Sequence, residues 1–245
     1  DTQRIAREFG RVDQPRAPAA GSYHPTKGRG DLTHYGDQTL VLLESVAQAD
    51  AFDQERFARD WQAFMADYRG YRDHATKDTL ANLRAGRPPS EAGSESSDLS
   101  GASRLAPVLF RYAGDPAAQI AAARAQAAAT HRHPDVVDSA EFFTRVVQAV
   151  LDGREVPQAV EEVAETYFPR PPFVRWVADG LKSRGEETLE VIRRFGQQCD
   201  VQAGFPAVVH LVARYPNDFR SALVENVMAG GDSAARGMLV GMLLG

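Results

Sequence analysis

The side chains best suited to catalysis or ligand binding lie near the C-terminus, where Asp232 and Ser233 follow a Gly-Gly pair and precede an apolar run. This order predicts a turn that delivers polar side chains to a helix start, with Asp232 at the N-cap or in the first turn. A helix start leaves backbone N–H groups unpaired at the positive end of the helix dipole. Such a place suits a carboxylate, a phosphate or a metal–carboxylate cluster.

A second carboxylate, Asp37, stands just before an apolar helical pattern that predicts a helix over Gln38–Ala49. If the two segments meet in the fold, Asp37 and Asp232 form an oxygen-rich pocket that suits a hard cation such as magnesium. The polar neighbours that would share this pocket are Gln38, Thr39 and Ser233. The alternative is that each aspartate only caps its own helix, and the local sequence favours capping because acidic residues are common at helix starts.

Two further polar clusters lie in the middle of the chain. Asp98 and Ser100 have the composition of a helix N-terminus, and Arg104 would follow in its first turns, where it could pair with Asp98 or bind an anion. His131 and His133 precede a proline, and they are too close together and too far from cysteine to suggest a zinc site. Ligand contact, helix capping and simple exposure stay open for these histidines.

Other catalytic patterns are absent from the sequence. There is no Gly-rich phosphate loop with its lysine, no GxSxG nucleophile elbow and no HExxH. The single cysteine, Cys199, has no basic neighbour that would favour a thiolate, which argues against a nucleophilic role.

Composition and charge narrow the function classes. The length of 245 residues and the hydrophobic fraction of 43% predict one compact domain. A net charge of −5 with interspersed Arg and Glu provides no basic stripe, so nucleic acid is not an expected partner. One cysteine and no apolar run long enough to span a bilayer predict a cytoplasmic protein with no membrane partner. Because the chain opens without Met and closes within a helical pattern, we expect both ends to have been trimmed from a longer chain.

Apolar residues recur at three- and four-residue steps along most of the chain, and no segment shows sustained period-two alternation. This periodicity predicts an all-α domain of roughly ten or more helices joined by short loops. A short amphipathic piece is expected around Ile5 and Phe9, and a mobile surface loop over Arg87–Ser97, which is rich in Ser, Glu, Pro and Gly. The expected helices are Gln38–Ala49, Phe52–Tyr68, Thr76–Leu83, Leu99–Tyr112, Pro116–Thr130, Asp135–Leu151, Val156–Tyr167, Phe173–Ser183, Glu186–Phe195, Phe205–Arg214 and Asp218–Met228.

Short segments occur in a recognisable order, namely Gly-Asp-Gln-Thr at 36–39, Ser-Gly-Ala-Ser-Arg-Leu-Ala-Pro at 100–107, Thr-His at 130–131 and Gly-Gly-Asp-Ser-Ala-Ala at 230–235. In this order they resemble the early Thr-Asp-Asp-Thr motif, the Gly-rich Arg-Pro-containing segment, the Thr-His pair and the late Gly-Gly-Asp-x-Asp-Thr motif of the ADP-ribosylglycohydrolase family. The resemblance covers most of the chain and is closest to the branch that contains the J-class crystallins.

The resemblance implies an all-α, multi-helix orthogonal bundle that cleaves the glycosidic bond at the ribose C1 of ADP-ribosyl groups, with a two-magnesium centre between the early and late motifs. It makes Asp37 and Asp232 the expected catalytic residues and metal ligands, and a nucleotide-sugar-like small molecule the expected ligand. The residues expected to bind the substrate are Asp98, Ser100, Arg104, His131, Gly231, Ser233 and Arg236.

Departures from the family pattern weaken the expected metal site. Only Asp37 keeps its carboxylate in the early motif and only Asp232 in the late one, while Gln38 keeps an uncharged carbonyl oxygen and Ala234 and Ala235 offer no donor. Two closely spaced divalent ions need several carboxylates to offset their mutual repulsion. We therefore expect no standard dimetal site, and either no cofactor or one weakly bound magnesium.

Two functions follow from this pattern. The first is a hydrolase of a ribosyl or related N- or O-glycosidic bond, because general acid–base work needs only one well-placed carboxylate. The second is a non-catalytic binding or structural protein on the same fold, as the crystallin branch suggests. In either, Arg236 would supply the positive charge that a lost metal no longer provides. A third, plainer possibility is a scaffold whose polar clusters are only helix caps.

Overall fold

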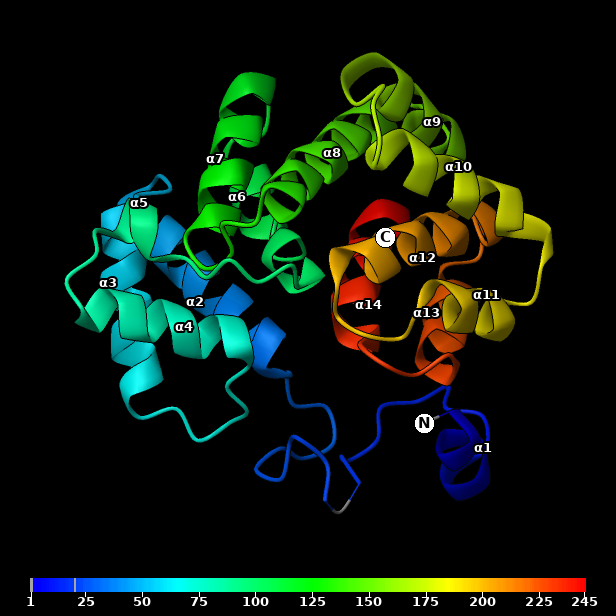
Figure 1. Cartoon of the computed structure of the whole chain (residues 1–245), viewed down its shortest axis with the longest axis horizontal. Helices are drawn as coiled ribbons and strands as arrows, with labels where there is room; N and C mark the ends of the chain where they lie inside the picture. The colour runs from blue at the N-terminus through cyan, green and yellow to red at the C-terminus, as the bar shows by residue number, and fades with distance from the viewer. Residues whose placement is uncertain (1, 20) are drawn as a thin grey trace. The chain divides into compact units, whose positions relative to one another are not determined.

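The structure is a computed structural model that describes residues 2–19 and 21–245. In this part of the chain the secondary-structure elements are all helices (Figure 1). The prediction of an all-α fold is confirmed. A single isolated bridge joins Ser94 and His131 among the described residues. None of the described helices is both long and apolar enough to cross a membrane.

The chain divides into two compact units, and each is described here by itself. Unit 1 takes in Asp1–Asp13 and Phe142–Gly245, and unit 2 takes in Gln14–Glu141. The boundary falls inside helix α8 (Pro134–Leu151), which begins in unit 2 and ends in unit 1. The single-domain assignment from the sequence stays a prediction.

Unit 2 is built on two packed helices near its start, and the N-caps fix where several of its helices begin. Asp53, Asp73 and Asp115 each accept a hydrogen bond from a backbone N–H in the first turn of the helix that follows them. This bond satisfies one of the N–H groups that a helix start leaves unpaired. The elements of unit 2 before α8 are α2 (His34–Ala49), α3 (Gln54–Ala66), α4 (His74–Arg84), α5 (Pro89–Ala92), the 3-10 helix η1 (Leu99–Ala102), α6 (Ala106–Arg111) and α7 (Pro116–Ala128).

The core of unit 2 lies where α2 and α3 pack together. Phe57, Trp61 and Met65 recur along one face of α3 and are buried, as is Leu42 of α2. This spacing is the apolar stripe of an amphipathic helix, and it confirms the sequence prediction for α3. The packing fixes the first turn of α2, which carries the early motif.

The prediction of one continuous helix over Leu99–Tyr112 is wrong. The structure has two separate elements there, first η1 and then α6. Pro107 lies in the first turn of α6. A proline has no N–H to continue a hydrogen-bond ladder from a preceding turn, so it favours the first turn of a helix over the interior. The break leaves Arg104 at the junction between η1 and α6, from which its side chain enters the interior.

The surface loop predicted over Arg87–Ser97 is also wrong in part, because Ala92 and Ser94 are buried. The Ser94 N–H donates to the carbonyl of Thr130 at 3.0 Å, and the Ser94 carbonyl accepts from the N–H of Arg132 at 2.6 Å. These backbone bonds join segments far apart in the sequence, which a composition rich in Ser, Glu, Pro and Gly cannot reveal.

The other predicted helices are confirmed with shifted ends, including the short amphipathic piece at the N-terminus. Helix α2 begins at His34 rather than at the predicted Gln38, so the early motif lies within its first turns. The elements of unit 1 after α8 are α9 (Val156–Tyr167), α10 (Phe173–Lys182), η2 (Ser183–Gly185), α11 (Thr188–Phe195), α12 (Val201–Arg214), α13 (Phe219–Met228) and α14 (Ser233–Leu244), and α1 (Thr2–Phe9) precedes them in the chain.

Helix α12 is the centre of unit 1 (Figure 1). It is buried on nearly all sides, as expected of a helix whose residues are apolar all round. Phe205 of α12 lies with its ring centroid 4.9 Å from those of Phe142 and Phe143. The same ring is 5.4 Å from Phe173 and from Trp176 of α10. Contacts at these separations add to the burial energy of each ring.

Helix α12 also carries a buried histidine. His210 is fully buried, with Nδ1 at 2.8 Å from the Ser183 hydroxyl and Nε2 at 3.0 Å from the Thr188 hydroxyl. Burial, with a smaller contribution from the charge of Arg214, lowers the pKa of His210 to about 4. The imidazole is therefore a neutral structural group at pH 7.

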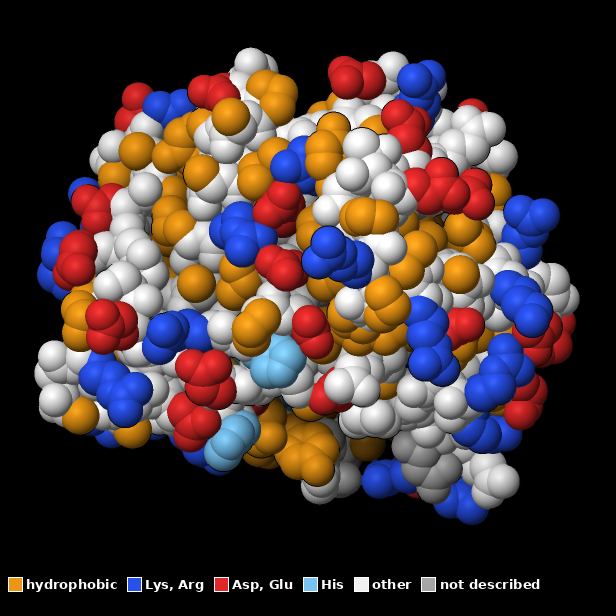
Figure 2. Space-filling model, turned by 45° about the horizontal axis from the view of Figure 1, so that its top comes forward, with side chains coloured by type: hydrophobic (Ala, Val, Ile, Leu, Met, Phe, Trp, Pro, Cys, Tyr) orange, Lys and Arg blue, Asp and Glu red, His pale blue; other side chains and the backbone are white. Residues whose placement is uncertain are grey.

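On the face drawn in Figure 2, Lys and Arg side chains lie among Asp and Glu side chains. The sequence-based exclusion of nucleic acid, which depends on such mixing, stays a prediction.

We expect Phe205→Ala to lower the free energy of unfolding by about 3–5 kcal/mol, because it removes the ring at the centre of the aromatic cluster and leaves a cavity. The matched control is Phe110→Ala, since the Phe110 side chain is 83% exposed and its removal should cost less than about 0.5 kcal/mol. Urea unfolding followed by circular dichroism measures both. Similar losses in the two variants would contradict the cluster's role.

Acidification should destabilise the chain through His210. Between pH 6.5 and about 4 the histidine of the unfolded chain binds a proton that the folded one does not, so stability falls as the pH falls through this range. One such group contributes a slope on the order of 1 kcal/mol per pH unit. Urea unfolding at several pH values should show a shallower slope for His210→Gln and an unchanged slope for the exposed control His74→Gln. Equal slopes for wild type and His210→Gln would refute this assignment.

Candidate functional site

The early motif opens α2, and its second polar residue, Gln38, points into unit 2. The Gln38 carbonyl oxygen accepts from the indole N–H of Trp61 at 2.9 Å and from Nη1 of Arg104 at 2.8 Å. All three side chains are buried. An amide oxygen with two lone pairs is thus fully used by two donors.

Arg104 connects this motif to the Thr-His pair. Its Nη2 donates a short hydrogen bond to the hydroxyl of Thr130, whose oxygen lies 2.9 Å from Nδ1 of His131. The Thr130 hydroxyl accepts from the guanidinium, and we assign its own proton to the bond with Nδ1, which puts the proton of neutral His131 on Nε2. Burial lowers the pKa of His131 to about 4, so this imidazole is neutral at pH 7.

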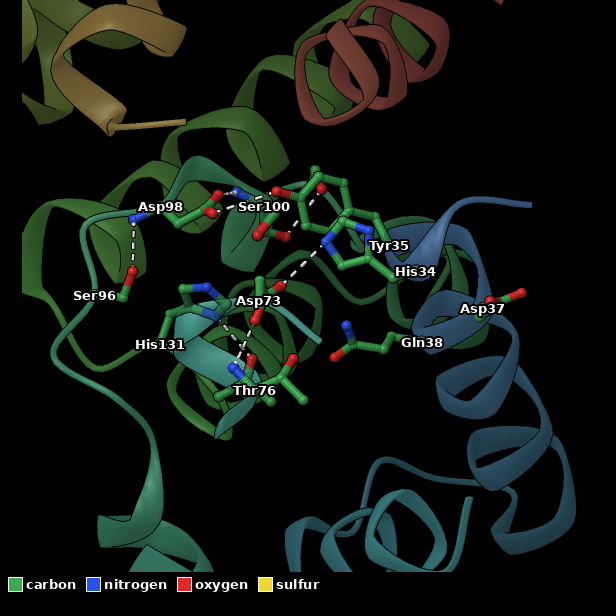
Figure 3. Close-up of polar contacts among 12 residues, drawn as sticks. His34, Tyr35, Asp37, Gln38, Asp73, Thr76, Ser96, Asp98, Ser100 and His131 are labelled. Carbon is green, nitrogen blue, oxygen red and sulfur yellow. Dashed lines mark hydrogen bonds and ion pairs between the residues drawn. The ribbon is translucent and has the colours of Figure 1, made fainter. Parts of the chain in front are cut away.

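Two carboxylates belong to the same region of unit 2 (Figure 3). Asp73, the N-cap of α4, accepts from the Thr76 N–H at 2.6 Å and lies 3.3 Å from Nε2 of His34. Burial alone would raise the pKa of Asp73, but the contacts with His34 and Thr76 outweigh it and hold that pKa well below its usual range.

The second carboxylate, Asp98, is the N-cap of η1 and is buried. It accepts from the Ser100 N–H at 2.8 Å and from the Tyr35 hydroxyl at 3.3 Å. We call Gln38, Arg104, Thr130, His131, Asp73 and Asp98 the buried polar cluster. The Arg104–Asp98 pair that the sequence suggested is replaced by hydrogen bonds from Arg104 to Gln38 and Thr130.

Two nitrogens of the buried polar cluster have no hydrogen-bond partner among the described residues. They are Nε2 of His131 and Nε of Arg104. Buried donors are nearly always paired with protein, with water or with a ligand. The buried polar cluster thus contains two nitrogens whose hydrogen-bonding capacity is not used by the described residues.

Gly101 makes room for the imidazole of this cluster. A Cβ at Gly101 would lie 2.6 Å from Cγ of His131, well inside van der Waals contact. The Gly101 carbonyl accepts from the Gln126 side-chain amide at 3.1 Å, which holds the backbone in place. Only glycine fits at this position as the structure stands.

Asp37 points away from the buried polar cluster, whereas its neighbour Gln38 points toward it (Figure 3). Consecutive residues of an α-helix point about 100° apart around its axis, which separates the two side chains. Asp37 Oδ2 accepts from Nζ of Lys27 and from the hydroxyl of Tyr68, each at 2.6 Å. Burial and this bond raise the pKa of Tyr68 well above its usual range. The N-cap of α2 is Thr33, so Asp37 does not cap its helix.

As arranged, the early-motif side chains do not fit a divalent cation. A cation at Asp37 Oδ2 would meet the Lys27 ammonium bonded to the same oxygen, and the Gln38 oxygen is already used by two donors. Within the described part of the chain, no group of three or more His, Cys, Asp and Glu side chains is placed to hold a metal ion.

The late motif forms the turn before α14 in unit 1. Gly230 and Gly231 both have a φ of 66°, and a Cβ on Gly231 would lie 2.0 Å from the carbonyl oxygen of Gln197. The Asp232 N–H donates to that carbonyl at 2.9 Å. Asp232 is the N-cap of α14, as predicted, but its side chain makes no capping hydrogen bond. Ser233 is half-buried at the first position of α14.

Arg236 braces this turn from inside. The side chain is buried, donates from Nε to the Asn226 side-chain oxygen at 2.9 Å and from Nη2 to the Gly230 carbonyl at 2.5 Å. Burial lowers the pKa of Arg236 to about 10, so the guanidinium stays charged at pH 7. Its role toward a ligand stays a prediction.

Sequence reasoning thus identified Asp98, Ser100, Arg104 and His131, and the structure brings these residues together in unit 2. Reasoning from the sequence missed Lys27, Tyr68 and Asp73 as members of the site. The signal for Asp73 is an aspartate directly before a helix, whereas Lys27 lies in an irregular segment with no pattern to mark it.

Gly101→Ala should destabilise the chain by about 1–3 kcal/mol, because the added methyl overlaps the His131 ring and something must shift to admit it. Gly185→Ala is the matched control, since a Cβ there meets no atom within 4 Å. Denaturant unfolding compares the two. A Gly101→Ala variant as stable as Gly185→Ala would show that His131 does not pack on this glycine.

Comparison with known proteins agrees with the motifs. The family model described as ADP-ribosylglycohydrolase matches residues 2–245. A solved structure titled "ADP-ribosylglycohydrolase-related protein complex" matches with a TM-score of 0.66 and 21% identity, covering 94% of this chain and 78% of that one. At that identity the likeness supports the fold alone. No curated protein matches the chain. With the family model matched over nearly its whole length, this chain belongs to the ADP-ribosylglycohydrolase family.

Proposed function

We propose that this chain binds a nucleotide-sugar-like ligand and hydrolyses a ribosyl or related N- or O-glycosidic bond without a standard two-magnesium centre. Family membership supports the reaction class. The observation that carries the site is the pair of buried nitrogens without a partner, Nε2 of His131 and Nε of Arg104, beside the carboxylates of Asp73 and Asp98. Ribose hydroxyls supply both donors and acceptors, which is the complement of such a set.

The proposed chemistry uses charges that the chain itself supplies. Cleavage of a glycosidic bond builds positive charge on the sugar ring in an oxocarbenium-like transition state. Asp37 accepts hydrogen bonds from an ammonium and a phenol on one carboxylate oxygen, and we assign this carboxylate to stabilising that charge. Asp232 keeps the late motif's carboxylate, and on that ground we assign it the general acid–base role.

A second candidate is a non-catalytic binding or structural protein on the same fold, as in the crystallin-like branch. One observation favours it, namely that Asp37 Oδ2 is already used by Lys27 and Tyr68. Displacing either donor to free this oxygen costs a charge-assisted or short hydrogen bond, which argues against a role for it in catalysis. Binding without turnover would select this candidate.

Calorimetry with ADP-ribose tests the ligand site. We expect the wild type to bind, His131→Ala to bind at least about 10-fold more weakly because it loses a buried donor, and His133→Ala to bind as the wild type does. His133, two positions along, only accepts a local bond from the Asp135 N–H and serves as the matched control. Absence of binding to the wild type, or equal affinity of the two variants, would remove the buried polar cluster from ligand recognition.

Turnover is tested with an arginine-linked ADP-ribosyl peptide in the presence of a chelator. The hydrolase proposal expects release of ADP-ribose that persists under chelation and falls about 100-fold or more in Asp37→Asn, since the isosteric amide lacks the charge. Circular dichroism confirms that the variant keeps its helices. Turnover that stops on chelation would show that hydrolysis needs a bound metal ion and would overturn that element of the proposal. Binding without any turnover would favour the non-catalytic candidate.

A further inference from the structure

Lys27 lies in the irregular segment before α2, yet its side chain is largely buried in unit 2. The Lys27 side chain is 17% exposed and the Asp37 side chain 14% exposed, and the distance from Nζ to Oδ2 is 2.6 Å. A lysine on a surface is normally extended into water, with its charge hydrated. Here the charge is shielded from solvent and directed at one carboxylate oxygen.

Tyr68 completes the arrangement from a third segment, after the end of α3. Its hydroxyl donates to the same Asp37 oxygen at 2.6 Å, and Lys27 Nζ lies 5.8 Å from the centre of its ring. The Tyr68 backbone is fixed in turn, because its carbonyl accepts from Nη2 of Arg72 at 3.0 Å. Phe64 packs against the ring with 5.1 Å between centroids. Two separate segments therefore position donors on a single carboxylate oxygen of a third segment, α2.

We propose that Lys27 is a built-in cation that takes the place of a metal ion at Asp37 and keeps hard cations from binding there. The ammonium balances the carboxylate charge through a charge-assisted hydrogen bond. A second cation brought to the same oxygen meets a like charge at close range, where partial burial weakens screening. Unlike a metal ion, the lysine cannot be removed by a chelator or lost by dilution.

This role deepens the proposed function and rests on it only in placing Asp37 at the site. It accounts for how the early motif can work after losing its other carboxylate, since one positive charge suffices for the one aspartate that remains. A purely structural Lys27, tying its segment to α2, would also form this ion pair. The two roles differ in what happens to cation affinity when the ammonium is removed.

Terbium luminescence measures that affinity, because Tyr68 touches Asp37 and can sensitise a lanthanide bound there. Terbium is a hard, oxygen-seeking cation and is used here as the probe itself. The variants are Lys27→Met, which keeps the length of the side chain without its charge, the charge-conserving control Lys27→Arg, and the double variant Lys27→Met/Asp37→Asn. Circular dichroism checks that each keeps its helices.

We expect Lys27→Met to bind terbium at least about 10-fold more tightly than the wild type, which is about 1.4 kcal/mol. Lys27→Arg should bind as the wild type does, and the double variant should lose the gain. No gain in Lys27→Met, or a gain that survives Asp37→Asn, overturns the proposal and leaves Lys27 as a structural anchor. ADP-ribose is absent from these titrations, so their failure is distinguishable from failure of the hydrolase proposal.

Discussion

The buried guanidinium of Arg104 is the group on which the candidate site in unit 2 depends. A charge without water must be hydrogen-bonded, and Arg104 achieves this through Gln38 on α2 and Thr130 after α7. Trp61 of α3 joins the same Gln38 oxygen. One side chain at the junction of η1 and α6 thereby connects the early motif, the core of unit 2 and the Thr-His pair.

This dependence gives a physical reason for glutamine at position 38. The uncharged amide oxygen of Gln38 accepts from both the indole of Trp61 and the guanidinium of Arg104. Because this oxygen carries no formal charge, it does not neutralise the charge of Arg104. Asp98 and Asp73 supply the opposing charge at longer range. Gln38 is thus hydrogen-bonded within the interior of unit 2, and the same helix turn directs Asp37 elsewhere, to Lys27 and Tyr68.

In the late motif of unit 1, residues expected to bind a ligand also support the backbone of the turn before α14. Gly231 is required by the close approach of the Gln197 carbonyl, and Arg236 supports the turn from within. Residues that the motif comparison marks for a ligand therefore also hold the backbone in place. Motif residues of this kind identify a family more directly than they identify chemistry, because a glycine or arginine can serve the turn alone.

Local sequence patterns were enough to predict the helical class, most helix positions and the segments that carry polar side chains. These follow from local rules, since an apolar stripe repeats every three to four residues and aspartates precede helix starts. The sequence did not reveal that Leu99–Tyr112 is broken, although Pro107 was a visible signal. Its expectation of a surface loop was wrong at Ala92 and Ser94, where burial depends on a backbone partner far along the chain.

The pairing of polar groups, in contrast, depends on how the helices and loops pack in the folded chain. The packing of α2 on α3 and the path of an irregular segment bring together Lys27, Asp37 and Tyr68. The periodicity of the sequence does not indicate which of these segments will lie next to one another. The same holds for Gln38, Trp61 and Arg104. Local sequence specifies which side chains are available, but hydrogen bonds across long chain separations exist only once the core has fixed the distances between helices.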